Sequence, residues 1–573
     1  MRLPLLLLAF ELPFLVTGSA PTAVIGDVTF TGRRTSDNVE FFGGIPFAEP
    51  PVADLRLKPP VPKMFSSGQQ ATFNATQFGP SCVQTKLPPE QLSEDCLSLN
   101  IFRPSNISSD KSLPVMVWVY GGGFIVGSSS RYDGTPLVNR SVSRGTPTIL
   151  VTVNYRLGPL GFPRGEEVFR DAEAGSHILN LGLQDNVAAL QWVQENIASF
   201  GGDPSKVTVF GESSGARALE LLILNGEIEG LARGVIIEST ARIPDVIPQS
   251  PAANETWNNF MSALPNCVNS SLSDIECIRN LTTADLINGY NDAGIFFSFA
   301  EASEWTPTFG DRHLPGMPST LMPKKKVVEA VLIGTNKDEG TLATNQSVNT
   351  DQVIKDTILG SPPSPPNATQ SEREAQLNKL ESILNKTLAL YPNIPSKGSP
   401  FDTGNETFGL DPQYKRTAAV ATDYVYNSER RYHINNQLLP AGISTYSYLF
   451  TDPDAVPMRD FVVGTPVPGS LGVSHTSEVY YVFGILSEQP EVPEVTPTAA
   501  KLSDMMMDYW ISFADALNPN DAAGSDRPEW PEYTTYNPIL LELNGHNTTV
   551  VLDNLRESQV ALFVDDPTVL GYR

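Results

Sequence analysis

Histidine and cysteine are scarce in this sequence, with five and four residues among 573. None of the histidines lies in a zinc motif such as His-Glu-x-x-His, and the cysteines lack the close spacing of a zinc ribbon. The sequence therefore predicts no metal site and no cofactor. The four cysteines can pair in three ways, and two short local loops are the economical solution in an oxidising compartment. We expect Cys82 to pair with Cys96 and Cys267 with Cys277.

Basic residues are also few relative to acidic ones. The sequence has 39 lysines and arginines and 64 aspartates and glutamates, which gives a formal net charge of −25. An acidic surface repels phosphate backbones and anionic lipid head groups, so nucleic acid is a poor candidate partner. The same charge keeps a protein soluble, and we expect a monomer or a weak dimer.

Long apolar runs are missing beyond the N-terminus, so no integral membrane segment is predicted. The N-terminus joins Arg2 to an apolar stretch at residues 3–10 and reaches small residues at 17–20, an order typical of a secretory signal peptide. Glu11 interrupts the apolar run, and Pro21 follows the small-residue exit. We expect residues 1–20 to be a signal peptide and residues 21–573 to be a single large domain, secreted and extracellular.

Asn-x-Ser/Thr sequons are numerous, and in an exported chain their number favours several glycosylated surface positions. The candidate asparagines are Asn74, Asn106, Asn139, Asn254, Asn269, Asn280, Asn345, Asn367, Asn385, Asn405 and Asn547.

Short runs of β-branched and apolar residues predict buried strands at residues 115–119, 148–153, 207–210 and 327–333. Continuous apolar runs of this kind suit strands covered on both faces, as in a parallel sheet. Between two of them, apolar residues recur at helical spacing up to Ile197, with Asp185 near the start and Gly201 after the end. Strand, helix and strand in this order indicate an α/β fold with a largely parallel sheet flanked by helices.

The strand signal fades at residues 240–320 and 345–440. We interpret both regions as insertions that cap the sheet and form substrate walls. The proline-rich stretch at residues 361–366 predicts an extended surface loop, because proline supplies no backbone donor.

The segment Gly211-Glu212-Ser213-Ser214-Gly215 fits the pattern Gly-x-Ser-x-Gly between a predicted strand and a predicted helix. This is the context of a nucleophile elbow, in which flanking glycines permit a tight turn that exposes the serine hydroxyl. Ser213 is therefore the candidate nucleophile. The alternative is an ordinary strand-to-helix turn in which Ser213 caps the helix.

A second glycine motif follows the predicted strand at 115–119, in the order Tyr120-Gly121-Gly122-Gly123-Phe124. Glycines let backbone N–H groups point at a ligand without a side chain in the way. In an acyl-transfer enzyme such donors receive the developing oxyanion, whereas the plain alternative is a flexible turn.

The two glycine motifs together resemble the type-B carboxylesterase and lipase family, which includes cholinesterases and extracellular fungal lipases. The resemblance extends over most of the mature chain. It includes Phe42-Gly43-Gly44-Ile45-Pro46-Phe47-Ala48, Glu94-Asp95-Cys96-Leu97-Ser98-Leu99-Asn100-Ile101, Asn154-Tyr155-Arg156-Leu157-Gly158 and Phe200-Gly201-Gly202-Asp203-Pro204.

This resemblance implies the α/β-hydrolase fold and a Ser-Glu-His triad. The family's acid segment matches Gly334-Thr335-Asn336-Lys337-Asp338-Glu339-Gly340 after the predicted strand at 327–333, which makes Glu339 the acid. The family's histidine loop matches the segment around His475, the implied base. Backbone N–H groups of Gly122, Gly123 and Ser214 would form the oxyanion hole. The resemblance also implies buried polar neighbours of the triad at Glu212, Ser239 and Glu478.

Three departures from the family pattern stand out. Ser214 replaces the usual alanine, and Tyr120 stands where many esterases have histidine; neither change removes a catalytic group. The loop between Cys82 and Cys96 contains only 13 residues, with two prolines and few apolar side chains. Lidded lipases of the family carry a longer amphipathic flap there, so the short loop favours soluble esters over interfacial lipids.

The sequence therefore predicts a secreted serine carboxylic-ester hydrolase that forms an acyl-enzyme on Ser213 and acts on soluble short- to medium-chain esters. One alternative is an interfacial triacylglycerol or steryl-ester lipase with the same triad, so the substrate is a small-molecule or a lipid ester. Another is a non-catalytic adhesion or binding homologue, which the intact triad disfavours.

Overall fold

The computed structural model describes residues 19–65, 71–107, 112–242, 247–295, 305–323, 326–359, 369–462, 464–492 and 494–565. The expected signal peptide falls almost entirely outside these ranges, as do the proline-rich stretch at 361–366 and the sequon at Asn367.

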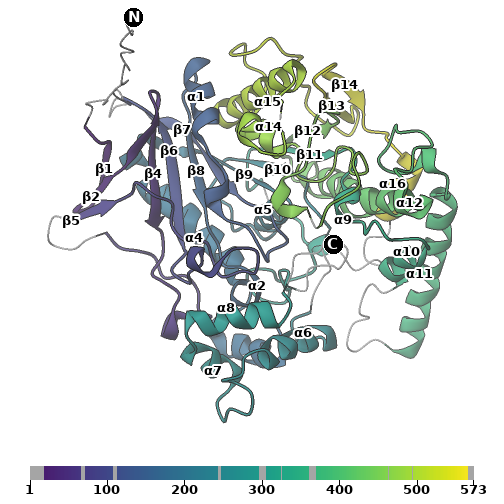
Figure 1. Ribbon diagram of the computed structural model, residues 1–573, viewed down its shortest axis with the longest axis horizontal. Coiled ribbons are helices and arrows are strands. Elements are labelled where there is room, and N and C mark those ends of the chain that lie inside the picture. The colour runs from purple at the N-terminus through teal and green to yellow at the C-terminus, as the bar shows by residue number, and fades with distance from the viewer. Residues whose placement is uncertain are drawn as a thin grey trace, which may run out of the picture.

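The described strands form two sheets (Figure 1). Their bounds are β1 (Thr22–Ile25), β2 (Val28–Thr31), β3 (Arg33–Ser36), β4 (Val39–Pro46), β5 (Ala71–Asn74), β6 (Ser98–Pro104), β7 (Leu113–Val119), β8 (Ile149–Val153), β9 (Gly202–Glu212), β10 (Gly234–Glu238), β11 (Ala330–Asn336), β12 (Ser444–Phe450), β13 (Ile539–Leu543) and β14 (Thr549–Leu552).

The described α-helices alternate with the strands in the first half of the chain and gather in two insertions. Their bounds are α1 (Thr135–Ser143), α2 (Gly158–Gly161), α3 (Glu166–Asp171), α4 (Leu181–Asn196), α5 (Ser214–Asn225), α6 (Pro251–Ser262), α7 (Asp274–Asn280), α8 (Thr283–Asp292), α9 (Gly340–Ala343), α10 (Gln352–Leu359), α11 (Gln370–Leu390), α12 (Pro412–Ala421), α13 (Ser428–Tyr432), α14 (Val479–Phe483), α15 (Pro497–Ala516) and α16 (Glu557–Val564).

The larger sheet has eleven strands in the order β14-β13-β12-β11-β10-β9-β7-β8-β6-β4-β3. The central run from β8 to β13 is parallel throughout, and the pairs at both edges are antiparallel. Every residue of β7, β8, β10 and β11 is buried, which means that both faces are covered. The prediction of a mostly parallel sheet flanked by helices is confirmed. The smaller sheet, β1-β2-β5, stands beside it at the left of Figure 1.

Strand β11 differs from the strand predicted at residues 327–333. It begins at Ala330 and continues to Asn336, because its parallel pairing with β12 runs through Asn336. Gly334 makes this possible: a Cβ at that position would lie 2.2 Å from the ring of Tyr448 on β12. Part of the predicted acid segment therefore belongs to the strand, and the loop proper starts at Lys337.

Helix α4 starts four residues before Asp185, which does not mark the helix start as the sequence suggests. The Asp185 carboxylate is buried and accepts hydrogen bonds from Arg156 at 2.8 Å (Nε) and 2.7 Å (Nη2). The aspartate therefore serves a buried ion pair between α4 and the segment after β8.

Both predicted insertions contain helices among their described residues. Helices α6, α7 and α8 lie together at one end of the molecule, and α10, α11, α12 and α16 gather on another side (Figure 1). The second group has its own apolar cluster, which includes Ile358, Leu384, Val420 and Phe563. Among the described residues, no helix has the length and apolar character to cross a membrane.

Candidate active site

Ser213 lies at the turn between β9 and α5, in the strand-turn-helix context that the sequence predicts. Its backbone has φ 56° and ψ −124°, a conformation that an L-residue adopts only under constraint. The Ser213 side chain makes no capping hydrogen bond to α5, so the interpretation as a simple helix cap is wrong. Its Oγ instead lies 2.8 Å from Nε2 of His475.

The strained backbone at this turn is packed closely against the turn after β7, and each of the two turns contributes a glycine to the contact. A Cβ on Gly215 would lie 2.1 Å from the Val119 carbonyl oxygen, and one on Gly121 would lie 2.5 Å from Oε2 of Glu212. The elbow and the turn after β7 therefore approach each other closely because neither glycine carries a side chain.

His475 and Glu339 complete a continuous chain of hydrogen bonds with Ser213. The distance from His475 Nδ1 to Glu339 Oε2 is 2.6 Å, and Glu339 Oε1 accepts the Asn336 backbone N–H at 2.7 Å. Ser213 is 5% exposed, and the other two side chains are fully buried. An imidazole with its proton on Nδ1 donates to Glu339 and accepts the serine hydroxyl proton on Nε2.

Asp338, which the sequence analysis did not single out, holds the histidine loop beside the acid. Its backbone N–H donates to the Val473 carbonyl at 2.9 Å, and its Oδ2 accepts the Val473 N–H at 3.0 Å. The Ser399 hydroxyl and the Phe401 N–H also donate to Oδ1, at 2.8 and 2.7 Å. This buried carboxyl therefore joins three segments that are distant in sequence.

The turn after β7 contains Gly122 and Gly123, the glycines predicted to supply oxyanion donors. Gly122 has φ +121° and Gly123 has φ +64°, and the Gly122 carbonyl accepts the N–H groups of Ile125 and Val126 at 3.1 Å each. Ser214 is the first residue of α5 and is buried, so its N–H belongs to the helix N-terminus, where the macrodipole favours negative charge. Tyr120 stacks on Tyr155 with ring centroids 4.6 Å apart.

The three residues predicted as polar neighbours of the triad are buried, and the structure shows their contacts. Glu212 Oε1 is 3.1 Å from His475 Nε2. The Ser239 hydroxyl donates to Glu478 Oε1 at 3.0 Å, and Asn336 Nδ2 donates to Glu478 Oε2 at 2.5 Å. Asn336 also donates to the Ser474 carbonyl at 2.9 Å, so these side chains connect the acid strand to the histidine loop.

Sequence reasoning missed a further buried carboxyl, Glu238 at the end of β10. It pairs in register with Glu212 of β9, and its Oε1 accepts the Trp510 indole N–H at 2.7 Å. The only signal in the sequence was a glutamate that ends an apolar strand, directly before Ser239.

Burial controls the charge of these carboxyls. Burial and the charge of Glu478 raise the pKa of both Glu212 and Glu238 well above the ordinary range of glutamate. Burial and the charge of Glu339 raise the pKa of Glu478 to about 7. Burial and nearby negative charge therefore favour the neutral form of Glu212 and Glu238.

The other histidines lie outside this arrangement where the structure shows their contacts. His313 Nδ1 bonds Glu227 at 2.5 Å, and His433 Nδ1 bonds Gln437 at 2.6 Å. Within the described ranges, no cluster of three or more His, Cys, Asp or Glu side chains could hold a metal ion.

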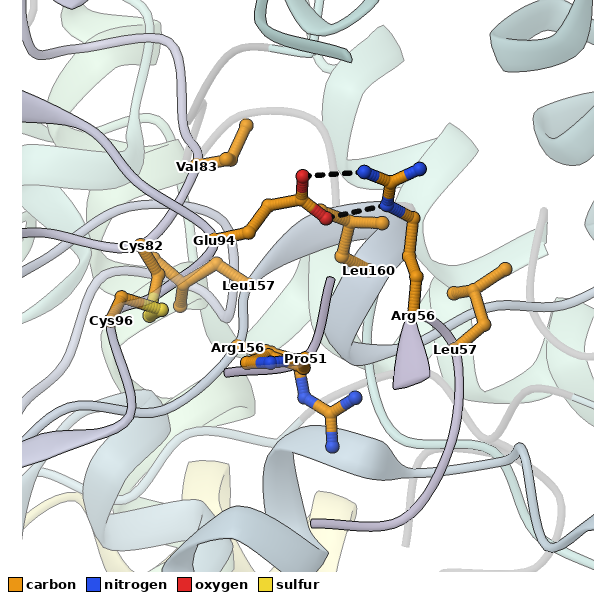
Figure 2. Close-up of a pocket in the computed structure, with 10 residues that line it drawn as sticks. All are labelled: Pro51, Arg56, Leu57, Cys82, Val83, Glu94, Cys96, Arg156, Leu157 and Leu160. Atoms are coloured by element: carbon orange, nitrogen blue, oxygen red, sulfur yellow. Dashed lines mark hydrogen bonds and ion pairs between the residues drawn. A yellow bond between two sulfur atoms is a disulfide. The ribbon is translucent and has the colours of Figure 1, made fainter. Parts of the chain in front are cut away.

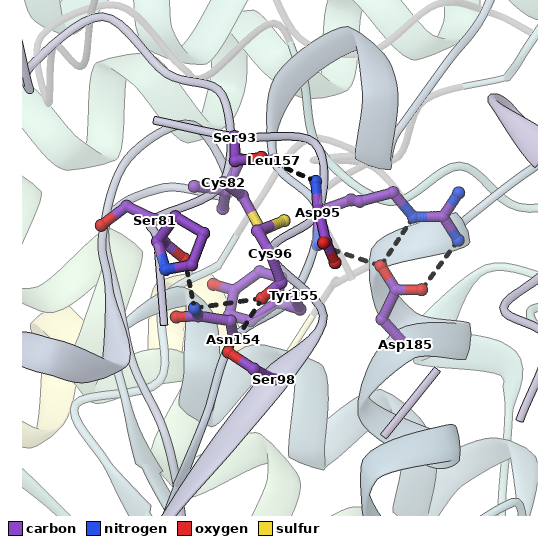
Figure 3. The surroundings of a disulfide bond; sticks show 12 residues. Ser81, Cys82, Ser93, Asp95, Cys96, Ser98, Asn154, Tyr155, Leu157 and Asp185 are labelled. Carbon is purple, nitrogen blue, oxygen red and sulfur yellow. Dashed lines mark hydrogen bonds and ion pairs between the residues drawn. A yellow bond between two sulfur atoms is a disulfide. The ribbon is translucent and has the colours of Figure 1, made fainter. Parts of the chain in front are cut away.

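Both disulfides join the cysteines that the sequence pairs. Cys82 is bonded to Cys96, and Cys267 to Cys277. Figure 3 shows Asn154 beside the first disulfide, where its amide Nδ2 donates to the carbonyls of Pro80 at 3.1 Å and Cys96 at 3.2 Å.

Most of the candidate glycosylation sites are accessible. Eight of the described asparagines are exposed, and two are half-buried. The exposed ones are Asn74, Asn106, Asn269, Asn280, Asn345, Asn385, Asn405 and Asn547, and the half-buried ones are Asn139 and Asn254. Glycosylation itself stays a prediction.

Comparison with known proteins agrees with this geometry. A sequence model described as the carboxylesterase family matches residues 20–563. Lipase 4 of Diutina rugosa is 31% identical over 98% of this chain and 99% of its own. Secreted lipase 1 of Botryotinia fuckeliana is 31% identical over 96% of this chain and 93% of its own. The crystal structure of Aspergillus niger EstA superposes with a TM-score of 0.76 at 24% identity, covering 96% of this chain and 99% of that one. The chain therefore belongs to the carboxylesterase family, and it is a carboxylic ester hydrolase with the α/β-hydrolase fold.

Proposed function

We propose that Ser213 is the nucleophile, His475 the general base and Glu339 the orienting acid of this hydrolase. The observation that carries the proposal is the unbroken hydrogen-bond chain from Ser213 Oγ through His475 to Glu339, at 2.8 and 2.6 Å. Serine is a weak nucleophile until a base accepts its proton, and the acid fixes the imidazole tautomer and stabilises the imidazolium.

The reaction proceeds in two steps through an acyl-enzyme. Ser213 Oγ attacks the ester carbonyl as His475 Nε2 takes the hydroxyl proton, and the N–H groups of Gly122, Gly123 and Ser214 stabilise the oxyanion. Collapse of the tetrahedral intermediate breaks the bond to the alkoxy oxygen, which leaves as alcohol with the proton from His475. Water then gives a proton to His475 and attacks the acyl carbon. Collapse of this second intermediate breaks the bond to Ser213 Oγ, which takes the proton back from His475, and the carboxylic acid leaves.

The raised pKa of Glu212, which favours its neutral carboxyl, suits this cycle. Its Oε1 lies 3.1 Å from His475 Nε2, the atom that gains and loses the proton. A carboxylate there would add negative charge next to the developing oxyanion on the carbonyl, whereas a neutral carboxyl does not. Glu478 and Ser239 act one layer further out, where they hold Asn336 and through it the backbone N–H that Glu339 accepts.

We propose soluble short- to medium-chain esters as substrates. The support is the loop between Cys82 and Cys96, where Glu94 forms a buried ion pair with Arg56 at 2.5 Å (Figure 2). Arg56 also donates to the Ile278 and Leu281 carbonyls at 2.6 and 2.9 Å, at the end of α7. A loop tied to the helical insertion in this way is a fixed wall and not an opening flap.

The second candidate is an interfacial lipase that acts on triacylglycerols or steryl esters. It is favoured by the names of the relatives from Diutina rugosa and Botryotinia fuckeliana, both of which are lipases.

We also propose that the protein is exported and that residues 1–20 are a cleaved signal peptide. The two disulfides support this proposal, because disulfides suit an oxidising compartment.

Hydrolysis of a p-nitrophenyl ester series from acetate to palmitate tests the proposal, with Ser213→Ala as the matched control. We expect a short- or medium-chain optimum in the wild type and no hydrolysis above background in the variant. A long-chain optimum that rises sharply above the substrate's solubility would contradict the esterase assignment and favour the lipase. Undiminished turnover by a folded Ser213→Ala protein would contradict the catalytic assignment itself.

A further inference from the structure

The Cys82–Cys96 loop makes an unusual contact with the backbone of a single residue, Gly127. The side chain of Gln84 is fully buried, and its amide nitrogen Nε2 donates to the Gly127 carbonyl at 2.8 Å. Its Oε1 accepts the Gly127 N–H at 2.9 Å. One side-chain amide therefore satisfies both backbone groups of Gly127, and Nε2 also donates to the Cys82 carbonyl at 3.1 Å.

Gly127 closes the glycine-rich turn that begins at Tyr120 and contains Gly122 and Gly123. It has φ +130°, and a Cβ there would lie 2.4 Å from the Tyr120 ring, so the backbone lies directly on that ring. The Gly122 carbonyl already accepts the N–H groups of Ile125 and Val126. The turn is thus fixed by its own hydrogen bonds in the middle and by Gln84 at its end.

The loop that carries Gln84 is itself anchored. The disulfide fixes both of its ends, and Glu94 near one end pairs with Arg56 at 2.5 and 2.7 Å (Figure 2). Directly after Gln84, the Thr85 hydroxyl donates to the Ile295 carbonyl at 2.7 Å. Such a support can hold Gly127 in one position, because the side chain that contacts it is locked by its surroundings.

The residues after Gly127 are held from the same region. The Ser81 and Ser128 hydroxyl oxygens lie 2.8 Å apart, and the Ser129 N–H donates to Asn154 Oδ1 at 2.9 Å. Asn154 in turn contacts the disulfide loop through the Cys96 carbonyl at 3.2 Å (Figure 3). The loop and its surroundings therefore also hold Ser128 and Ser129, which follow Gly127 in the sequence.

We propose that Gln84 is a positioning residue for ester hydrolysis: its double hydrogen bond to Gly127 holds the turn that presents the Gly122 and Gly123 N–H groups to the oxyanion. The inference rests on the oxyanion role assigned above. Oxyanion donors act only within a narrow range of distance, and losing one typically lowers kcat by about 10²- to 10³-fold. Displacing donors by releasing Gly127 lowers kcat less, by about 10- to 100-fold, while KM stays within about twofold because the acyl and alcohol pockets are untouched.

The test compares Gln84→Ala and Gln84→Glu with Thr85→Val on p-nitrophenyl butyrate. Thr85→Val removes a hydrogen bond of the same loop that does not reach the turn, and it is expected to keep kcat within about twofold. The carboxylate of Gln84→Glu accepts the Gly127 N–H but cannot donate to its carbonyl. Protonation restores a donor, so the ratio of variant to wild-type kcat is expected to rise as the pH falls. The ratio cancels the titration of groups that both proteins share.

A folded Gln84→Ala protein with unchanged kcat would overturn the inference, and so would an equal loss of kcat in Thr85→Val. If Gln84→Ala fails to fold, the ratio of the kcat of Gln84→Glu to that of the wild type decides. A ratio that does not change with pH would overturn the inference. Ser213→Ala and Gly122→Ala, measured alongside, separate the two proposals. Activity retained in those variants means that the proposed function is wrong, whereas activity lost there but kept in the Gln84 variants means that only this inference is wrong.

Discussion

Replacing Glu478 by glutamine should change how the stability of this protein depends on pH. Burial and the charge of Glu339 raise the pKa of Glu478 from 4.5 to about 7. Between these two values the unfolded chain releases the proton that the folded protein keeps, so rising pH favours unfolding. At about 1.4 kcal/mol for each unit of pKa shift, the wild type loses about 3 kcal/mol of unfolding free energy over this window.

The glutamine variant has no proton to retain, so it escapes this loss. Its amide carries one acceptor where the carboxylate uses two, toward Ser239 and Asn336, and this adds an offset that does not vary with pH. The free energy of unfolding is measured by guanidinium titration with tryptophan fluorescence, for both proteins, from pH 4.5 to 8. Relative to the wild type, we expect the free energy of unfolding of the variant to rise by about 3 kcal/mol from the low to the high end of that pH range. A difference that stays flat with pH would refute the assignment of a carboxyl that is protonated in the fold.

Three further variants test the site and its support. Glu339→Gln should lower kcat by about 10⁴-fold with little change in the melting temperature, because an amide leaves the imidazole in the wrong tautomer; steady-state kinetics and thermal unfolding measure both. Gly122→Ala places a Cβ 2.1 Å from the Val126 carbonyl at φ +121°, and kcat should fall at least about 10²-fold in the same assay. Replacing Cys82 and Cys96 together by serine opens a loop of sequence separation 14 and should lower the unfolding free energy by about 3 kcal/mol in a guanidinium titration. A fully active Glu339→Gln or Gly122→Ala protein, or an undiminished guanidinium midpoint in the double serine variant, would contradict the respective role.

The elbow at Ser213 was predictable because its signals are local. A strand, two glycines around a serine and a helix follow one another within a short segment, and the structure places β9, Ser213 and α5 in that order. The acid and the base required the family resemblance, because nothing near Glu339 or His475 distinguishes them from other residues of their type. Strand β11 was misplaced by three residues at each end, since its bounds depend on pairing with β12 and not on its own apolar run.

The supporting residues could not be found from the sequence for a physical reason. Glutamate, aspartate and glutamine usually lie at the solvent-exposed surface, yet Glu238, Asp338 and Gln84 are buried. Their partners are distant in the chain: Gln84 meets Gly127 across 43 residues, and Glu238 meets Trp510 across 272. Burial of such groups is tolerated only because the fold brings those partners together, and that information lies in the tertiary structure.

Covalent trapping of the nucleophile tests the central claim most directly. A fluorophosphonate forms a stable bond with an activated serine, and peptide mass spectrometry locates the adduct. We expect one adduct on Ser213, complete loss of ester hydrolysis with it, and no adduct in Ser213→Ala. An adduct on Ser214 or elsewhere, or ester hydrolysis that continues after Ser213 is fully modified, would contradict the assignment of Ser213 as the nucleophile.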